Sequence, residues 1–275
     1  MRRVIAVSAA AAAAALPFAL ASPASAADDA SVVVVHGVPD LTVDVYGSAD
    51  DEYSSEELLL EDFEPGTITD PVALPGGTYN LAVFPAGDDP AGDPAIEAND
   101  VDVPAGANIS VVAHLDESGT PTLTPFVNDT APTAAGEGRL VVRHTAAAPA
   151  VDVLAGGEPV FTGLTNPNEE SADLPAGTVS AAVALAGTTD PVIGPADVDV
   201  QEGAATIVYA WGSAEDGNLA LAVQTIDGLH SSPSGVPSGT AEVPGDTMPV
   251  ALAGVALAAA LAAGFMGLRA RRVRA

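Results

Sequence analysis

Two histidine and aspartate pairs with identical spacing are the first residues in this chain whose types could do chemistry. His36 stands eight residues before Asp44, and His144 stands eight residues before Asp152. An imidazole can bind a metal or move a proton at neutral pH. Neither histidine, however, has a second His or Cys close in sequence, as a zinc site would need. We therefore expect both to end strands and to hydrogen-bond the backbone of the turns that follow.

The residues around these pairs favour the same structural interpretation. His114 is matched by Trp211 when the two halves of the chain are aligned, so no second histidine is kept in both. Asp44 and Asp152 each lie inside Val-Asp-Val, where strand alternation places both valines on one face and the carboxylate on the other. We expect valines facing the core and a carboxylate that is either solvated or bonded to a turn.

Two acidic loops could supply oxygen ligands to a cation. One runs from Asp88 to Glu97, and the other lies within residues 50–57. Calcium is bound by such oxygens, yet neither loop has the alternating ligands and central glycine of an EF-hand loop. A solvated loop is the simpler interpretation, and a calcium-responsive binding module is kept as an alternative.

The motifs of common enzyme classes are missing from the sequence. It has no Gly-x-Ser-x-Gly elbow, no His-Glu-x-x-His, no phosphate-binding glycine loop and no cysteine. A cell-wall polymer hydrolase with a carboxylate pair is a remote alternative, because no spacing supports it. We therefore predict a protein that is not an enzyme, with no catalytic, cofactor-binding or metal-binding residues.

Short β-branched or alternating runs, bounded by Gly, Pro and Asp, position these residues. Such runs indicate strands, and seven or eight of them with frequent turns are typical of a β-sandwich. No segment has a sustained helical period, although residues 54–62 could form one helical turn. In the first half the runs cover residues 32–36, 42–46, 58–60, 68–74, 78–84, 98–103, 108–115 and 122–127.

Proline and glycine pairs predict how the chain turns. The segments 75–77 and 104–106 each combine a proline with a residue tolerant of positive φ, and this should reverse the chain between antiparallel strands. The stretch from His36 to Asp44 contains Pro39 at its middle. We expect it to be the opening hairpin of the fold, with the proline in the turn.

The second half of the chain repeats the first. Leu-Pro-Ala-Gly-Thr at residues 174–178 answers Leu-Pro-Gly-Gly-Thr at residues 74–78. The offset between the copies shrinks along the chain, which places deletions in the loops around residues 50–65 and 87–93. We predict two tandem sandwich domains, at residues 31–126 and 139–226, joined by a linker at residues 127–138.

Charge is distributed very unevenly. All 37 acidic residues lie between the terminal arginines, and Arg139 and Arg143 are the only basic residues among them. Such a field repels nucleic acid and anionic lipid and keeps a protein soluble. The absence of lysine beside abundant Ala, Gly, Pro, Val and Arg predicts a GC-rich genome, as in an actinobacterium or a haloarchaeon.

Both ends of the chain have the pattern of targeting signals. Residues 1–26 fit a secretory signal peptide, with cleavage expected after Ala26. Near the other end, a Ser/Pro/Gly-rich stalk at residues 227–247 leads into an uncharged stretch at residues 248–268 and an arginine tail at residues 269–275. This predicts one transmembrane helix with its C-terminus in the cytoplasm. A sortase signal is less favoured, because the chain lacks Leu-Pro-x-Thr-Gly.

The repeated motif resembles a known family. Val-Val-His, then a proline, then Val-Asp-Val-Tyr, with Leu-Pro-Gly-Gly-Thr further on, is similar to DUF4397, a family of exported bacterial and archaeal proteins. The second copy has Leu154 in place of the tyrosine, and the first has Gly76 where the family favours alanine. The resemblance implies two immunoglobulin-like β-sandwiches on a secreted or anchored protein, and it assigns no functional residues because the family's function is unknown.

These observations predict an all-β, membrane-anchored cell-surface protein. Two acidic sandwiches would serve in envelope structure, adhesion or ligand binding, with an extracellular or envelope partner that the sequence does not identify. The copies differ most in their loops, so a binding function is most naturally placed there.

Overall fold

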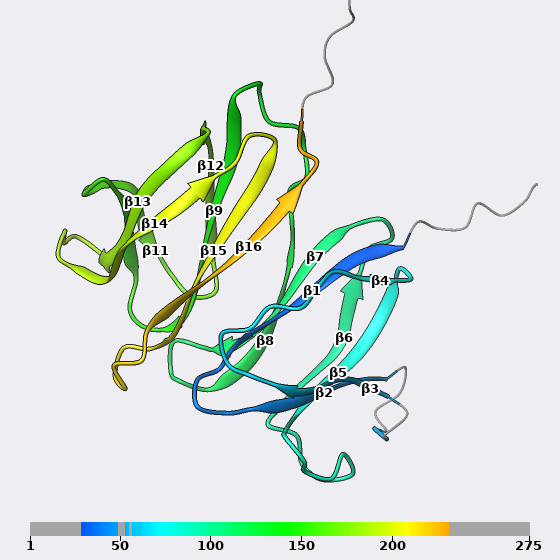
Figure 1. Cartoon of the computed structure of the whole chain (residues 1–275). Helices are drawn as coiled ribbons and strands as arrows, with labels where there is room; N and C mark the ends of the chain where they lie inside the picture. Colours follow the sequence, from blue (N-terminus) through cyan, green and yellow to red (C-terminus); the bar gives the residue numbers. More distant parts are fainter. Residues whose placement is uncertain (1–28, 49–52, 55–56, 231–275) are drawn as a thin grey trace, which may run out of the picture. The chain divides into compact units, whose positions relative to one another are not determined.

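The computed structural model describes residues 29–48, 53–54 and 57–230, which form strands and connecting loops (Figure 1). The predicted signal peptide with its cleavage site at Ala26, the transmembrane stretch and the arginine tail lie outside these residues. Within the described ranges, no helix has the length and apolarity needed to cross a membrane.

Eight strands form the first sandwich, and each predicted run in this half overlaps one of them. The predicted run at residues 68–74 is strand only at its end, and the predicted helical turn at residues 54–62 is wrong because residues from Leu58 onward form a strand. The strands are β1 (Ala30–Gly37), β2 (Val43–Ser48), β3 (Leu58–Phe63), β4 (Val72–Leu74), β5 (Gly77–Pro85), β6 (Ile96–Val103), β7 (Asn108–Leu115) and β8 (Pro121–Val127).

Eight further strands form the second sandwich. They repeat the order of the first, and β12 is much longer than its counterpart β4. The strands are β9 (Glu137–Ala147), β10 (Val151–Ala155), β11 (Glu158–Leu164), β12 (Glu169–Pro175), β13 (Gly177–Leu185), β14 (Pro191–Val200), β15 (Ala204–Ser213) and β16 (Ala220–Asp227).

Each sandwich consists of two four-stranded sheets. The first has the orders β4-β1-β7-β8 and β3-β2-β5-β6, and the second has β12-β9-β15-β16 and β11-β10-β13-β14. In each sandwich the first strand pairs in parallel with the seventh. An immunoglobulin domain instead places its strands in the sheets ABED and CFG. The expected immunoglobulin-like arrangement is therefore wrong, whereas the β-sandwich and its duplication are confirmed.

The stretch from His36 to Asp44 is not a hairpin. β1 belongs to one sheet and β2 to the other, so the loop between them carries the chain from sheet to sheet. The same correction applies to segments 75–77 and 104–106, which join β4 to β5 and β6 to β7 across the sandwich. Proline and glycine in sequence mark a turn, but they do not determine whether the strands on either side pair with each other.

Burial explains why the valine runs lack alternation. Val32 of β1 packs with Ile109 and Val111 inside the first sandwich. Val33 and Val35 point the other way, into a cluster that includes Ile207 and Tyr209 of the second sandwich. β1 and β7 are therefore covered on both faces, and such strands read as continuous hydrophobic runs.

The deletions inferred for the second copy fall in loops. β10 connects to β11 through Gly156 and Gly157 alone, both with positive φ, whereas β2 and β3 are separated by residues 49–57. Two glycines of this kind form the tight turn of a two-residue hairpin. Both copies keep all eight strands in the same order, because the strands carry the core.

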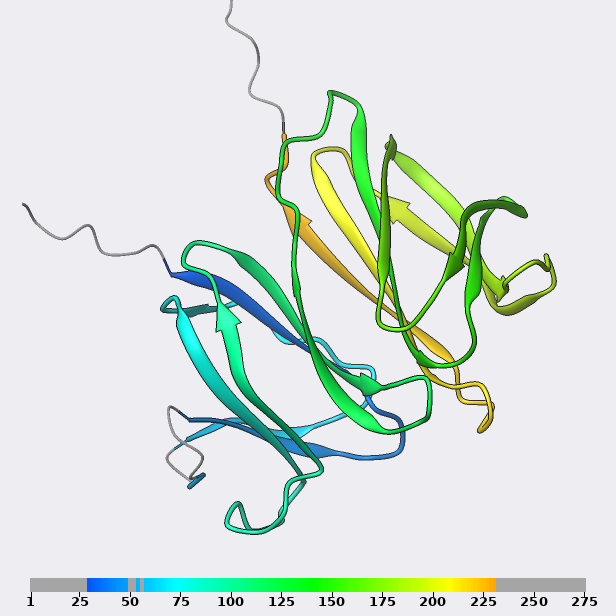
Figure 2. The same cartoon turned by 180° about the vertical axis from the view of Figure 1, so that it is seen from behind.

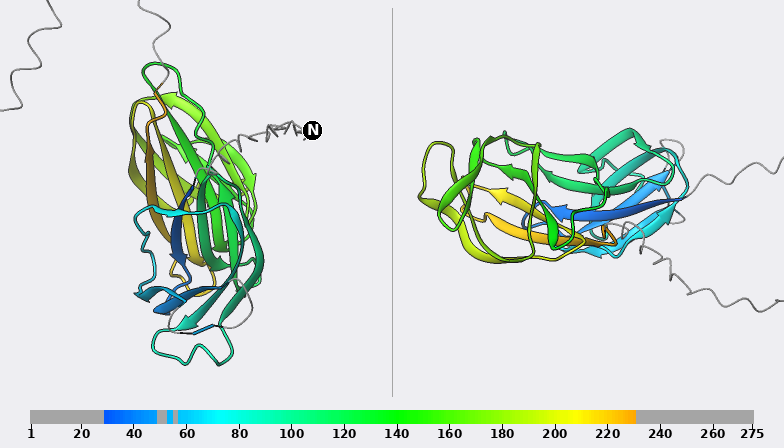
Figure 3. Two further views of the ribbon diagram at one scale, coloured as in Figure 1. Left: turned by 90° about the vertical axis from the view of Figure 1, so that its right-hand side faces the viewer. Right: turned by 90° about the horizontal axis from the view of Figure 1, so that it is seen from above.

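The two sandwiches belong to one compact unit, which contains all four sheets. Their strands follow the twist expected of stacked sheets (Figure 3). The folded part extends slightly beyond the predicted domain end, since Leu229 is buried and His230 bridges to Thr133. Residues 29–230 hold their own core and strand partners, so this segment should fold by itself.

Candidate functional site at the joint between the sandwiches

The two repeated histidines do what the sequence predicted. His36 Nε2 donates to the carbonyl of Leu41 at 2.7 Å, and His144 Nε2 donates to the carbonyl of Pro149 at 3.1 Å. Both side chains are fully buried, and burial lowers the pKa of each below the ordinary histidine value. They are therefore neutral side chains that fix the loop between two sheets.

His114 and Trp211 occupy matched positions, as the alignment of the two halves predicted. His114 lies opposite Gly37 in the parallel β1 and β7 pair, and Trp211 lies opposite Thr145 in the corresponding pair of the second sandwich. His114 Nε2 bonds to Thr124 Oγ1 at 2.8 Å, and burial lowers its pKa. The two positions are equivalent in the fold, but their side chains have no chemical role in common.

Asp44 is bonded to turns, and it is buried rather than solvated. One carboxylate oxygen accepts from the backbone N–H of Asp62 at 2.8 Å, and the other accepts from Gly87 at 3.0 Å. Both donor residues have positive φ. Asp44 thus ties the bulge on β3 to the turn that follows β5, on either side of its own strand.

Asp152 repeats this arrangement in the second sandwich. Its two oxygens accept from Gly163 and Gly187, each at 2.8 Å. Gly163 also lies in a bulge and also has positive φ. The Val-Asp-Val motif therefore encodes a buried clamp for two loops, which explains why it occurs in both copies.

The acidic loop from Asp88 to Glu97 forms ordinary turn contacts. Asp89 Oδ1 accepts from the backbone N–H of Ala91 at 3.0 Å. No three His, Asp or Glu side chains come together as a metal site in the described ranges. The second acidic loop lies largely outside these ranges, at residues 49–52 and 55–56.

A buried arginine that the sequence interpretation left unassigned lies where the two sandwiches meet. Arg143 on β9 is 1% exposed, and its guanidinium lies 4.3 Å from the ring centre of Phe126. Its Nε donates to Glu169 at 2.7 Å, its Nη1 to the Tyr209 hydroxyl at 2.8 Å and its Nη2 to Asn128 Oδ1 at 2.7 Å. All three nitrogens of the guanidinium are thus satisfied, as a buried charge requires.

Side chains from both sandwiches complete a closed ring of hydrogen bonds around Arg143. Tyr209 donates to Gln224 Oε1 at 2.6 Å, and Ser110 donates to the same oxygen at 2.9 Å. Asn128 Nδ2 donates to Ser110 Oγ at 3.0 Å, which closes the ring. Ser110 lies on β7 and Asn128 directly follows β8, so the first sandwich supplies two of the five members.

We call this contact the joint: it lies between the sheet β4-β1-β7-β8 and the sheet β12-β9-β15-β16. Apolar side chains surround the hydrogen-bonded ring on both sides. They are Val33, Val35, Val112 and Phe126 from the first sandwich and Val141, Ile207, Tyr209 and Ala222 from the second.

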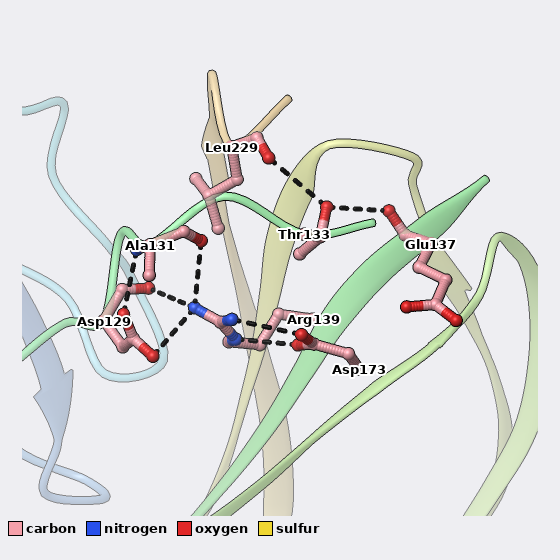
Figure 4. A network of polar contacts seen from close by, with 7 residues as sticks. All are labelled: Asp129, Ala131, Thr133, Glu137, Arg139, Asp173 and Leu229. Carbon is pink, nitrogen blue, oxygen red and sulfur yellow. Dashed lines mark hydrogen bonds and ion pairs between the residues drawn. The ribbon is translucent and has the colours of Figure 1, made fainter. Parts of the chain in front are cut away.

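Arg139 fastens the linker to the second sandwich (Figure 4). Its guanidinium makes two bonds to Asp173, at 2.8 and 3.2 Å, and an ion pair with Asp129 at 2.9 Å. It also donates to the carbonyls of Asp129 and Ala131. Hydrogen bonding to Asp173, followed by the two nearby carboxylates, raises the pKa of Arg139. The linker, seen as the green segment between β8 and β9 in Figure 2, is therefore held in place.

Trp211 adds an apolar contact at the same joint. A Cβ placed on Gly66 of the first sandwich would lie 2.8 Å from the Trp211 ring, and one on Gly37 would lie 3.2 Å from its Cβ. The indole of the second sandwich therefore packs against Gly66 of the first, and Gly37 lies close to the Trp211 Cβ. A side chain at Gly66 would force the indole to shift.

Composition did contain a signal for the joint. Arg139 and Arg143 are the only basic residues among 37 acidic ones, and they stand four apart in one strand. Even spacing puts both on the same face of β9. In addition, Arg143 replaces Val35 at the matched position of the first copy, which marks a face that differs between the sandwiches.

Geometry and bonding define a pair of β-sandwiches locked together through a buried polar ring. Residues 30–154 match the family model described as Domain of unknown function (DUF4397). The match spans the first sandwich, the linker and the first two strands of the second sandwich, so it includes both Arg139 and Arg143. A search of curated proteins found no relative.

Proposed function

We propose that this protein is a non-enzymatic cell-surface protein that presents two acidic β-sandwiches as one rigid body. The second sandwich would be a further DUF4397 copy that has diverged in sequence. A stalk and a single helix at residues 248–268 would hold the pair outside the membrane, with the arginine tail in the cytoplasm.

The buried joint is the observation that carries this proposal. Enzyme sites often lie in an open cleft where two domains meet. The centre of this joint is instead filled by Arg143, Tyr209 and Gln224, with exposures of 1%, 0% and 7%. A closed joint supports a role in holding surfaces at a fixed distance.

The polar residues repeated in both copies support the same function. His36 and Asp44 bond to backbone groups of their own sandwich, as do His144 and Asp152. These side chains are thus engaged in maintaining the fold. The acidic surface would repel nucleic acid and anionic lipid, which suits a protein whose partner is neutral or cationic.

Cell fractionation with protease treatment tests this function. We expect the mature chain in the membrane fraction and expect protease added to intact cells to cut the stalk and release residues 29–230 as one intact piece. Recovery of the mature chain in the cytosol would refute surface presentation. Release of the two sandwiches as separate pieces would refute the rigid pair.

A further inference from the structure

A cavity of about 190 Å³ lies between the two sheets of the first sandwich. Its walls are inward side chains of both sheets, among them Val34, Val111 and Leu74 on one side and Val45, Leu60 and Val83 on the other. An apolar cavity of about 150 Å³ is large enough to bind benzene. The first sandwich therefore has room for a molecule with one small ring.

Two exposed apolar residues mark where the cavity reaches the surface. Leu59 on β3 and Val72 on β4 line it, and they are 52% and 51% exposed. β3 and β4 are the edge strands of the two sheets. β4 has only three residues, whereas its counterpart β12 pairs with β9 along seven. The short edge strand leaves this side of the first sandwich less covered.

One buried polar atom of the lining residues, Nδ1 of His36, lacks a hydrogen-bond partner in the described part of the chain. Because His36 Nε2 donates to the carbonyl of Leu41, its proton is on that nitrogen and Nδ1 must be an acceptor. In the described part of the chain this buried Nδ1 has no partner. The other polar lining groups are engaged, since Thr69 Oγ1 accepts from the Val34 N–H and the Tyr79 hydroxyl donates to the carbonyl of Pro75.

The matched histidine of the second sandwich shows how such an atom is normally satisfied. His144 Nδ1 accepts from the backbone N–H of Ala146 at 3.4 Å. A buried acceptor left without a donor loses its hydrogen bond to water and gains nothing in return. His36 Nδ1 is such an acceptor, and the His36 ring is held in place by stacking on Phe63, with ring centres 5.5 Å apart.

We propose that the first sandwich binds a small neutral apolar molecule that carries one hydroxyl, with the hydroxyl donating to His36 Nδ1 and the body filling the cavity. A donor is required because Nδ1 can only accept. Neutrality follows because the walls are apolar, the protein is strongly acidic, and Arg139 and Arg143 are both engaged in the second sandwich. Phenol is the simplest probe of this chemistry.

Binding of phenol and benzene to residues 29–230 tests the proposal. The two probes differ by the one hydroxyl, and a hydrogen bond is worth roughly a two- to tenfold tighter affinity. We expect saturable phenol binding that is tighter than benzene binding by this factor. We also expect the ¹⁵N NMR signal of His36 Nδ1 to move with phenol occupancy, while that of His144 stays in place.

A variant whose cavity is filled by larger side chains provides a second test of phenol binding. In the second sandwich, Leu140 and Phe161 stand where the first has Val32 and Leu60. Val32→Leu combined with Leu60→Phe should therefore fill the cavity with side chains that this fold accepts and should abolish phenol binding. The control, His144→Gln, should leave phenol binding unchanged.

Three outcomes would overturn the proposal. They are the absence of saturable phenol binding to the folded wild-type segment, binding that moves the His144 signal in place of the His36 signal, and equal affinity of the filled variant. This test is done in solution, so its result is independent of whether the protein is presented on a cell surface.

Discussion

Arg143 Nη2 donates to Asn128 Oδ1 at 2.7 Å, and this bond joins the two sandwiches through residues that are 1% and 7% exposed. Asn128 directly follows the last strand of the first sandwich, and Arg143 lies in the first strand of the second. A charged hydrogen bond therefore connects the start of the linker to the strand that follows it. The pair of sandwiches should unfold as one cooperative unit.

A double-mutant cycle on this bond tests the cooperative joint. Hydrogen bonds to charged groups contribute about 1.5–3 kcal/mol, so Arg143→Ala and Asn128→Ala should show a coupling energy in that range in urea unfolding. The control cycle pairs Arg143→Ala with Asp102→Ala, at an exposed position of β6, and should give a coupling energy below about 0.5 kcal/mol. A similarly small value for the Asn128 cycle would show that the bond does not couple the sandwiches.

The two aspartate clamps should have equal energetic weight. Asp44→Asn keeps one accepting oxygen and turns an amide N–H₂ toward a backbone N–H, so it should lower the free energy of unfolding by about 1–3 kcal/mol. Asp152→Asn should cost a similar amount, because its two bonds are the same. Urea unfolding measures both, with Asp102→Asn as the exposed control. A negligible loss in both variants would contradict the clamp.

Strand positions could be predicted because the determinants are local. Val111 and Val112 alternate between faces whatever lies beyond them, and Gly106 permits positive φ by its own chemistry. Sheet membership depends instead on which distant strand supplies the partner. The loop from His36 to Asp44 therefore looked like a hairpin, although its ends belong to different sheets.

The joint was not predictable from local pattern for the same reason. Nothing near Arg143 in sequence indicates that Gln224 and Ser110 will complete a ring around it, since these residues lie on other strands. The unpaired Nδ1 of His36 is likewise a property of the packed core. The backbone bond of each repeated histidine, by contrast, is made five residues further along the chain and was predicted correctly.

Acidification should destabilise the protein before its carboxylates titrate. Burial lowers the pKa of His36, His114 and His144 below the ordinary value of 6.5, so the unfolded chain binds protons that the folded chain does not. Stability from these groups is thus complete above about pH 6.5 and is lost as the pH falls, by at most about 1.4 kcal/mol per pH unit for each histidine. Urea unfolding between pH 8 and 5 measures this slope. A free energy of unfolding that rises as the pH falls from 8 to 5 would contradict this prediction. So would NMR titrations that give these histidines pKa values of 6.5 or above.

Trp211 is the only tryptophan in the chain, so its fluorescence reports directly on the joint. Gly66→Ala should strain a backbone with φ of 77° and push a methyl to within 2.8 Å of the indole. Gly119→Ala is a matched control, because its φ is 84° but nothing lies within 4 Å of the added Cβ. Both variants bear the backbone cost of about 1–2 kcal/mol, and only Gly66→Ala should shift Trp211 emission to longer wavelength. Identical emission in the two variants would mean that Gly66 does not shape the contact with Trp211.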